Sequence, residues 1–172
     1  MESGFKIMPG GGVTAAALIR NDTDQTLNEI QLELSLQDAG GREVAKTGES
    51  LPFCPPRQDC WWGAIFVDSS QFGADHKSIA LVKTKILKDL GPRKDTPRLV
   101  ELTAKGDEFV GASTEGMVFM IGFESGKPTS GMSQNIEKRV SPMAVSAGEL
   151  KSSAGAQTVR AFLYEGVEQE GH

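Results

Sequence analysis

Hydrophobic and polar residues alternate along several short stretches of the chain, and this pattern predicts β-strands separated by turns. The clearest stretch is residues 30–37 (IQLELSLQ), where isoleucine and leucine occupy every second position. A period of two indicates an antiparallel strand with one buried face. Residues 38–41 (DAGG) supply the residue types of a hairpin turn, so we expect residues 42–48 to return as the partner strand.

Other stretches extend this pattern on both sides of the hairpin. Residues 13–20 (VTAAALIR) lead into an Asn-Asp-Thr-Asp turn, and residues 61–67 (WWGAIFV) are apolar at every position, as in a strand covered on both faces. Residues 79–88 alternate again, although their lysines leave a short helix over residues 78–90 as an alternative. In the second half we expect strands at residues 99–103, 117–123, 129–136, 140–146 and 158–165.

The order of strands and turns recurs after residues 90–97 (LGPRKDTP), where two prolines, a glycine and mixed charges interrupt the alternation. One interpretation is a tandem duplication of a five-strand unit. Its parts are a flexible N-terminal arm (1–12), a first unit (13–91), a linker (92–97), a second unit (98–166) and a tail (167–172). The alternative is one sandwich over residues 13–166, because any all-β chain has strands at similar spacing. Both predict an all-β fold, and the closest common architecture is an immunoglobulin-like antiparallel β-sandwich.

Composition and charge narrow the classes of protein. The chain has 172 residues, with 18 Lys and Arg against 23 Asp and Glu and a formal net charge of -5. A nucleic-acid binder needs a basic surface, so we expect no nucleic-acid partner. No apolar run approaches the roughly 20 residues of a membrane helix, so we expect no transmembrane segment. The N-terminal residues lack the basic and apolar regions of a signal peptide, which fits either a cytoplasmic chain or an exported one without its signal.

The two cysteines bear on the compartment. Cys54 and Cys60 flank a short turn containing two prolines, a spacing at which two cysteines can reach the Cα separation of about 5.5 Å that a disulfide prefers. We expect a structural disulfide, which favours an oxidising, extracytoplasmic location. Two free buried thiols are the alternative, followed by metal binding or redox use. A cytoplasmic location stays open.

Four aromatic residues are candidates for a binding surface. Trp61 and Trp62 are adjacent, so in a strand they face opposite sides, and one of them could be exposed. Phe162 and Tyr164 lie in the last expected strand, which carries few charges to block edge pairing. These four residues are therefore a candidate association surface, for self-pairing or for addition of a partner strand. In the alternative interpretation all four side chains belong to the core.

Motifs that carry catalysis or hold a cofactor are missing from the sequence. The chain has no Gly-x-Ser-x-Gly elbow, no phosphate-binding Gly-rich loop before a helix and no histidine-containing catalytic group. His76 and His172 are the two histidines, and neither has a neighbouring metal ligand. We therefore expect a protein that is not an enzyme, with no metal site and no cofactor. A small-molecule ligand is not specified by the sequence.

The segment from Val13 to Asp68 resembles the FxLYD-type domains of extracytoplasmic bacterial proteins. Those domains have a first strand ending in an Asn-containing polar turn, a strand ending in a Phe-x-Leu-Tyr-Asp signature, a Gly turn and a return strand. Here Leu34, Leu36 and Asp38 stand at the Phe, Leu and Asp positions, and Gln37 replaces the Tyr. The resemblance implies an immunoglobulin-like module and no catalytic residues.

Together these observations predict a non-enzymatic, extracytoplasmic β-sandwich module that binds a protein or ligand at the cell envelope. The alternative is a cytoplasmic structural or assembly protein that forms a homo-oligomer or larger complex through exposed strands. The thiol state of Cys54 and Cys60 separates the two, because a cytosolic chain keeps its cysteines reduced.

Overall fold

The computed structural model describes residues 2–7, 13–66, 81–89, 97–106, 108–110, 116–136, 144–146, 148–152 and 154–165. Most of these residues are in antiparallel β-strands, and α1 (Gly148–Ser152) is the helix among them. The all-β prediction is confirmed.

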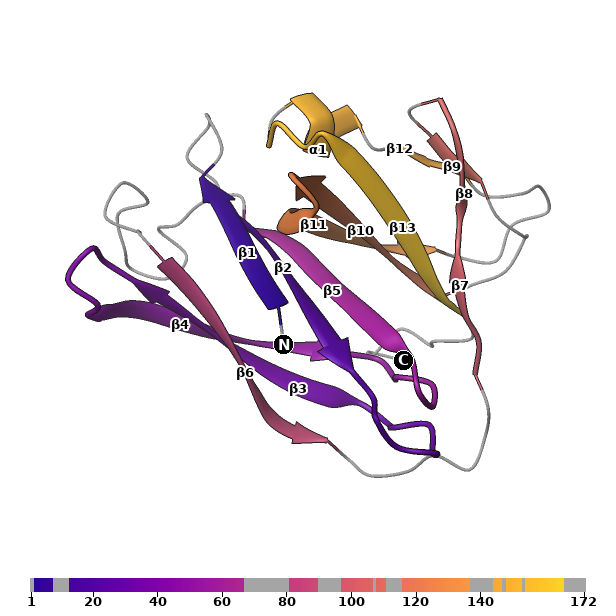
Figure 1. Cartoon of the computed structure of the whole chain (residues 1–172), viewed down its shortest axis with the longest axis horizontal. Coiled ribbons are helices and arrows are strands. Elements are labelled where there is room, and N and C mark those ends of the chain that lie inside the picture. Colours follow the sequence, from indigo (N-terminus) through magenta and orange to yellow (C-terminus); the bar gives the residue numbers. More distant parts are fainter. Residues whose placement is uncertain are drawn as a thin grey trace.

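The strands of the described residues form four sheets (Figure 1). We name them the central, leucine, aromatic and small sheets. The central sheet has the order β1 (Glu2–Ile7), β2 (Val13–Arg20), β5 (Asp59–Phe66), and the leucine sheet the order β4 (Glu43–Leu51), β3 (Ile30–Gln37), β6 (Leu81–Asp89). The aromatic sheet has the order β11 (Lys127–Ile136), β10 (Gly116–Glu124), β13 (Thr158–Glu165), β7 (Leu99–Glu101), and the small sheet the order β12 (Ala144–Ser146), β9 (Glu108–Val110), β8 (Thr103–Lys105).

The hairpin of β3 and β4 forms where the alternation predicts it. The four aliphatic side chains of β3 are buried, while the polar residues between them are exposed or half-buried. Asp38 starts the turn, and its carboxylate accepts hydrogen bonds from the backbone N–H groups of Gly40 and Arg42. Gly41 has a φ of 84°, a conformation that glycine adopts without steric cost. The turn residues thus fix the register that buries the leucines.

The central sheet is buried on both of its faces. Five consecutive residues at the start of β2, Val13 to Ala17, are buried, which is the pattern of a strand covered from both sides. One large cluster contains these residues together with the leucines of β3 and the aromatic residues of β10 and β13. The central sheet therefore lies between the leucine sheet and the aromatic sheet.

The aromatic sheet also has two covered faces. Phe119, Ile121 and Phe123 of β10 belong to the large cluster, while Val118 and Met120 between them belong to a second one. The second cluster is completed by residues near the small sheet and α1, among them Leu102, Phe109, Leu150 and Ala154. The alternation predicted for residues 117–123 is thus confirmed, with an apolar environment on each side.

Strand β11 crosses the central sheet at very close range. A Cβ atom at Gly63 of β5 would lie 2.7 Å from the Cα of Gly131 in β11, so neither position has room for a side chain. Beside this contact the buried Thr14 hydroxyl donates to the Gly131 carbonyl (2.6 Å) and accepts from the Gly131 N–H (2.8 Å). A threonine side chain of β2 therefore satisfies backbone groups that face away from the β10 ladder.

The N-terminal segment corrects one expectation. Residues 2–7, expected to be part of a flexible arm, form β1 and pair with β2 along their whole length. Phe5 packs against the large cluster, and Lys6 reaches the Glu124 carboxylate of β10 at 2.5 Å. The physical reason is that β1 satisfies the free edge of β2 and covers part of the core.

The other predictions made from the sequence have different outcomes. Residues 81–89 form a strand, which rules out the helical alternative there. Strand β12 lies within the strand expected at residues 140–146, whereas β9 and α1 were not anticipated. Residues 92–96 of the expected linker (92–97) and the tail at 167–172 lie outside the described residues. Residues of both proposed units share the large cluster. The tandem duplication and the single sandwich both stay interpretations.

Candidate functional site: a clasped double loop

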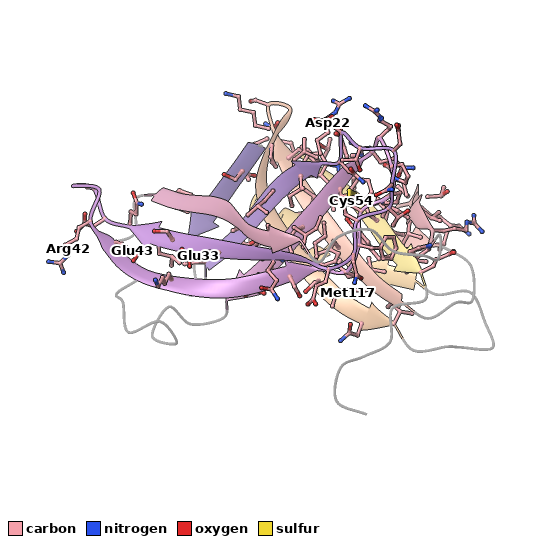
Figure 2. The ribbon with its side chains drawn as sticks, turned by 90° about the horizontal axis from the view of Figure 1, so that it is seen from below. Asp22, Glu33, Arg42, Glu43, Cys54 and Met117 are labelled. Carbon is pink, nitrogen blue, oxygen red and sulfur yellow. A yellow bond between two sulfur atoms is a disulfide. The ribbon has the colours of Figure 1, made fainter. Side chains whose placement is uncertain are left out.

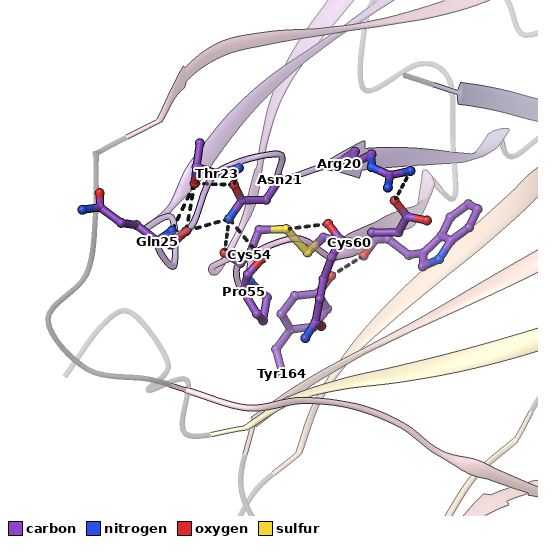
Figure 3. Close-up of a disulfide and its surroundings, with 11 residues drawn as sticks. Arg20, Asn21, Thr23, Gln25, Cys54, Pro55, Cys60 and Tyr164 are labelled. Atoms are coloured by element: carbon purple, nitrogen blue, oxygen red, sulfur yellow. Dashed lines mark hydrogen bonds and ion pairs between the residues drawn. A yellow bond between two sulfur atoms is a disulfide. The ribbon is translucent and has the colours of Figure 1, made fainter.

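Two loops meet at one end of the central sheet, and we call them together the double loop. The first comprises residues 21–27, between β2 and β3, and the second comprises residues 54–58, between β4 and β5. Leu27 and Cys54 form an isolated antiparallel bridge that joins them, with N–H to O distances of 2.9 and 3.1 Å. The Arg57 N–H also donates to the Thr23 carbonyl (3.2 Å). Figure 3 shows the two loops side by side.

The second loop is closed by a disulfide. Cys54 and Cys60 are bonded, with their Cα atoms 5.9 Å apart, which confirms the pairing expected from their spacing. Neither cysteine is free, so the alternatives of free thiols and metal binding do not hold. Both residues are 0% exposed. The crosslink therefore lies inside the large cluster, beneath the exposed residues of the loop.

Asn21 is the internal connector of the double loop. Its side chain is buried, and its amide nitrogen donates to the carbonyls of Gln25 (2.8 Å), Cys54 (3.0 Å) and Pro55 (3.0 Å). Its amide oxygen accepts from the Thr23 N–H (3.0 Å) and hydroxyl (2.6 Å). Burying an amide is costly unless its hydrogen bonds are made. Asn21 makes them all within the two loops and so fixes one loop against the other (Figure 3).

Charged side chains cover the outside of the double loop. Arg57 pairs with Asp24 at 2.9 Å, and Arg20 pairs with Asp22 at 3.0 Å and with Asp59 at 3.9 Å. Between 48% and 84% of these side chains is exposed, so each pair contributes little to stability. They are available to other molecules.

Arg57 has an unusual backbone conformation. Its φ is 56°, in the left-handed region that residues other than glycine and asparagine seldom adopt. Glycine would avoid the steric cost, but it would lack the guanidinium that reaches Asp24. The disulfide-closed turn holds an exposed charged residue in this conformation.

The four aromatic residues predicted as a binding surface lie in the core. Trp61, Trp62, Phe162 and Tyr164 are between 0% and 6% exposed. The reason is that both faces of the central sheet are covered and that β13 lies between β10 and β7 rather than at a sheet edge. The structure therefore corrects the placement of these side chains from surface to interior.

Their contacts support the double loop from below. The ring of Trp61 stacks on Phe162 (6.1 Å between centroids) and meets Phe123 edge to face (5.2 Å). The Tyr164 hydroxyl donates to the Trp61 carbonyl at 2.9 Å, and its ring meets Phe53 at 5.1 Å. Burial raises the pKa of Tyr164 far above its ordinary value, so the hydroxyl keeps its proton and stays a donor. Residues just before Cys54 and just after Cys60 are thus anchored to β13.

A bidentate ion pair borders the site. Arg160 of β13 donates to both carboxylate oxygens of Glu101, at 2.6 and 2.9 Å, and lies over the ring of Phe162. The hydrogen bond from Arg160 lowers the pKa of Glu101, and the same bond together with the charges of Glu101 and Asp59 raises the pKa of Arg160. Asp59 pairs with Arg20 at the double loop, and its charge also contributes to the raised pKa of Arg160.

The described residues do not gather the groups of a metal centre. No set of three or more His, Cys, Asp and Glu side chains there is placed to hold a metal ion. Across the same residues, no helix has the length and apolar character to cross a membrane.

Comparison with known proteins identifies no relative of this chain. No family model, curated protein or solved structure matches this chain.

Sequence reasoning did not identify Asn21 and Arg57. Asn21 stands where a strand meets a polar turn, which signals a turn residue and not a connector between two loops. Its acceptors at Cys54 and Pro55 lie 33 and 34 positions away in the chain. The Pro-Pro pair before Arg57 does indicate a tight turn within the cysteine loop, and that was the available signal.

Proposed function

We propose that this chain is a non-enzymatic, extracytoplasmic module of immunoglobulin-like type that binds a protein partner through the double loop. One observation carries the proposal: an exposed, charged surface whose backbone is fixed by a buried disulfide and a buried asparagine. Loops held by a rigid scaffold are where binding residues concentrate.

Rigidity is the property that favours binding. A surface that is already ordered pays less conformational entropy when a partner docks. Asn21 joins the two loops from inside, and the disulfide closes the second one. Arg57 supports the same conclusion, because backbone strain of about 1–3 kcal/mol persists where the surrounding structure enforces it and clusters at functional positions.

The chemistry of the surface favours a protein partner. It offers guanidinium donors (Arg20 and Arg57), carboxylate acceptors (Asp22 and Asp24) and the exposed amide of Gln58. Mixed charges at close spacing suit complementary pairing with another protein surface. They give no continuous basic patch for phosphates. A second copy of this chain is one such partner.

Two further features support an extracytoplasmic location. The disulfide is of the kind that forms and persists in oxidising compartments. The resemblance of residues 13–68 to FxLYD-type domains points the same way, since those domains belong to extracytoplasmic bacterial proteins. This location and the family assignment are part of the proposal.

Site-specific photo-crosslinking in exported protein tests the proposal. A photoreactive residue is placed at Gln25 or Gln58, both exposed in the double loop, and the matched control is the exposed Gln134 on β11. We expect one discrete protein adduct from positions 25 and 58, lost when Asp24→Lys is added, and no such adduct from position 134. An adduct of twice the chain mass identifies self-association. Equal adducts from all three positions, or adducts that ignore Asp24→Lys, contradict the proposal.

A further inference from the structure

The disulfide is placed where it controls the conformation of both loops. Most hydrogen bonds of the first loop to the rest of the site end on the crosslinked segment: Asn21 bonds to the carbonyls of Cys54, Pro55 and Gln58, and Thr23 accepts from Arg57. The Cys54–Cys60 bond fixes both ends of that segment. A change in the segment therefore reaches the exposed residues of both loops.

Reduction would force such a change. Two thiols need more room than a disulfide, because their sulfur atoms are no longer bonded and repel at the former bond distance. Both cysteines are 0% exposed within a packed cluster, and interiors have few voids to take up the extra volume. The segment must shift outward. Arg57 is then no longer held at a φ of 56°, and it relaxes toward the ordinary region and away from Thr23 and Asp24.

The body of the protein does not depend on this bond in the same way. The crosslink closes a short loop with a sequence separation of 6, so it restricts the unfolded chain only modestly. The sheets are held by two apolar clusters and by contacts such as Tyr164 with Trp61 that lie outside the loop. Loss of the disulfide should therefore change the conformation of the double loop and leave the sheets in place.

We propose that the Cys54–Cys60 disulfide is a redox latch that holds the double loop in its binding conformation. A dithiol reductant opens it. One reductant thiolate attacks a cysteine sulfur, which forms a mixed disulfide and releases the other cysteine as a thiolate. The second reductant thiol then attacks the reductant sulfur of the mixed disulfide and releases the remaining cysteine. Two electrons and two protons pass to the protein, which gains two thiols, and the reductant leaves as a cyclic disulfide. Because the sulfurs are buried, the attack follows a local opening of the loop. The inference depends on the proposed function in one respect: it takes the double loop to be the binding surface.

Amide hydrogen exchange with and without dithiothreitol tests the latch and needs no partner, so its failure is distinct from failure of the binding proposal. Reduction is verified by alkylating the two thiols and weighing the protein. We expect the backbone N–H groups of Asn21, Leu27 and Arg57 to exchange at least tenfold faster after reduction. Amides of β3 and β10 should change less than threefold.

The double variant Cys54→Ala/Cys60→Ala is the control for effects of the reductant itself. Because the variant has no sulfur atoms to reduce, its loop exchange should be the same with and without dithiothreitol. Two results overturn the latch. One is unchanged loop exchange in fully reduced protein, which would mean that the disulfide does not control the conformation of the double loop. The other is fast exchange throughout the sheets of either protein, which makes it a requirement of the whole fold.

Discussion

Replacing Asn21 by alanine removes the connector of the double loop. The substitution deletes a side-chain NH2 whose two N–H groups are shared among three carbonyls, and an amide oxygen that accepts two hydrogen bonds. Some partners keep other bonds: the Cys54 carbonyl still accepts from Leu27, and the Gln25 carbonyl from the Thr23 hydroxyl. The Pro55 carbonyl loses the partner that the structure gives it.

The magnitude follows from these partners. A hydrogen bond contributes about 0.5–1.5 kcal/mol net, and a buried group left without a partner costs about 1–3 kcal/mol. Because bonds that share one side chain do not add fully, we expect Asn21→Ala to lower the free energy of unfolding by about 3 kcal/mol. That is a large share of the about 5–15 kcal/mol of a typical domain.

Urea denaturation followed by fluorescence of the two tryptophans measures the loss. With a slope of about 2 kcal/mol per molar urea, the midpoint should fall by about 1.5 M. The matched control is Thr23→Ala in the same loop, which removes the hydroxyl and keeps the Asn21 amide donors. It should cost less than about 1 kcal/mol, because Thr23 is exposed. A similar small loss for Asn21→Ala would refute the role of Asn21.

Three further predictions follow from the core and its charges. Tyr164→Phe leaves the buried Trp61 carbonyl without the Tyr164 hydroxyl and should lower the free energy of unfolding by about 1–3 kcal/mol in urea melts. Burial raises the pKa of Glu49, so the folded state favours its protonated form, and the stability this gives at low pH is lost as the pH rises through the raised pKa. Glu49→Gln should therefore stabilise the protein more at pH 7 than at pH 4 by urea denaturation; an equal effect contradicts the assignment. The halves on either side of residues 90–97, produced separately, should show no cooperative thermal melt, because they share one apolar cluster. A cooperative melt of either half would support the tandem interpretation instead.

Much of the fold follows from local patterns in the sequence. The alternation in β3 and the turn at Asp38 specify a hairpin without reference to the rest of the chain. The pairing of Cys54 with Cys60 follows from a short spacing around prolines. In both cases the interacting residues are close in sequence, so a local pattern contains the information.

The placement of the aromatic residues depends on contacts that are remote in sequence. Trp61 and Trp62 face opposite sides of β5, and whether a second face is covered depends on sheets formed elsewhere in the chain. Tyr164 meets Trp61 across 103 positions. Strand β1 is similar, since ESGFKI has weak alternation and is ordered by the edge of β2. Such residues need tertiary information.

The candidate site shows the same division. Figure 2 shows Asp22 and Cys54 away from Arg42 and Glu43 at the tip of the β3–β4 hairpin. Asp22 and Cys54 belong to different loops, which the Leu27–Cys54 bridge joins. The sequence predicts each turn separately. The hydrogen bonds of Asn21 and the conformation of Arg57 that join the turns into one surface are properties of the folded chain.

The thiol state of Cys54 and Cys60 in the cells that make the protein tests the central claim most directly. Cells are quenched in acid, free thiols are alkylated, and the intact mass is measured with and without prior reduction. We predict an unalkylated protein two hydrogens lighter than the reduced chain, as an extracytoplasmic module with a closed double loop requires. A protein with both cysteines alkylated without prior reduction would contradict both the extracytoplasmic location and the disulfide-closed double loop.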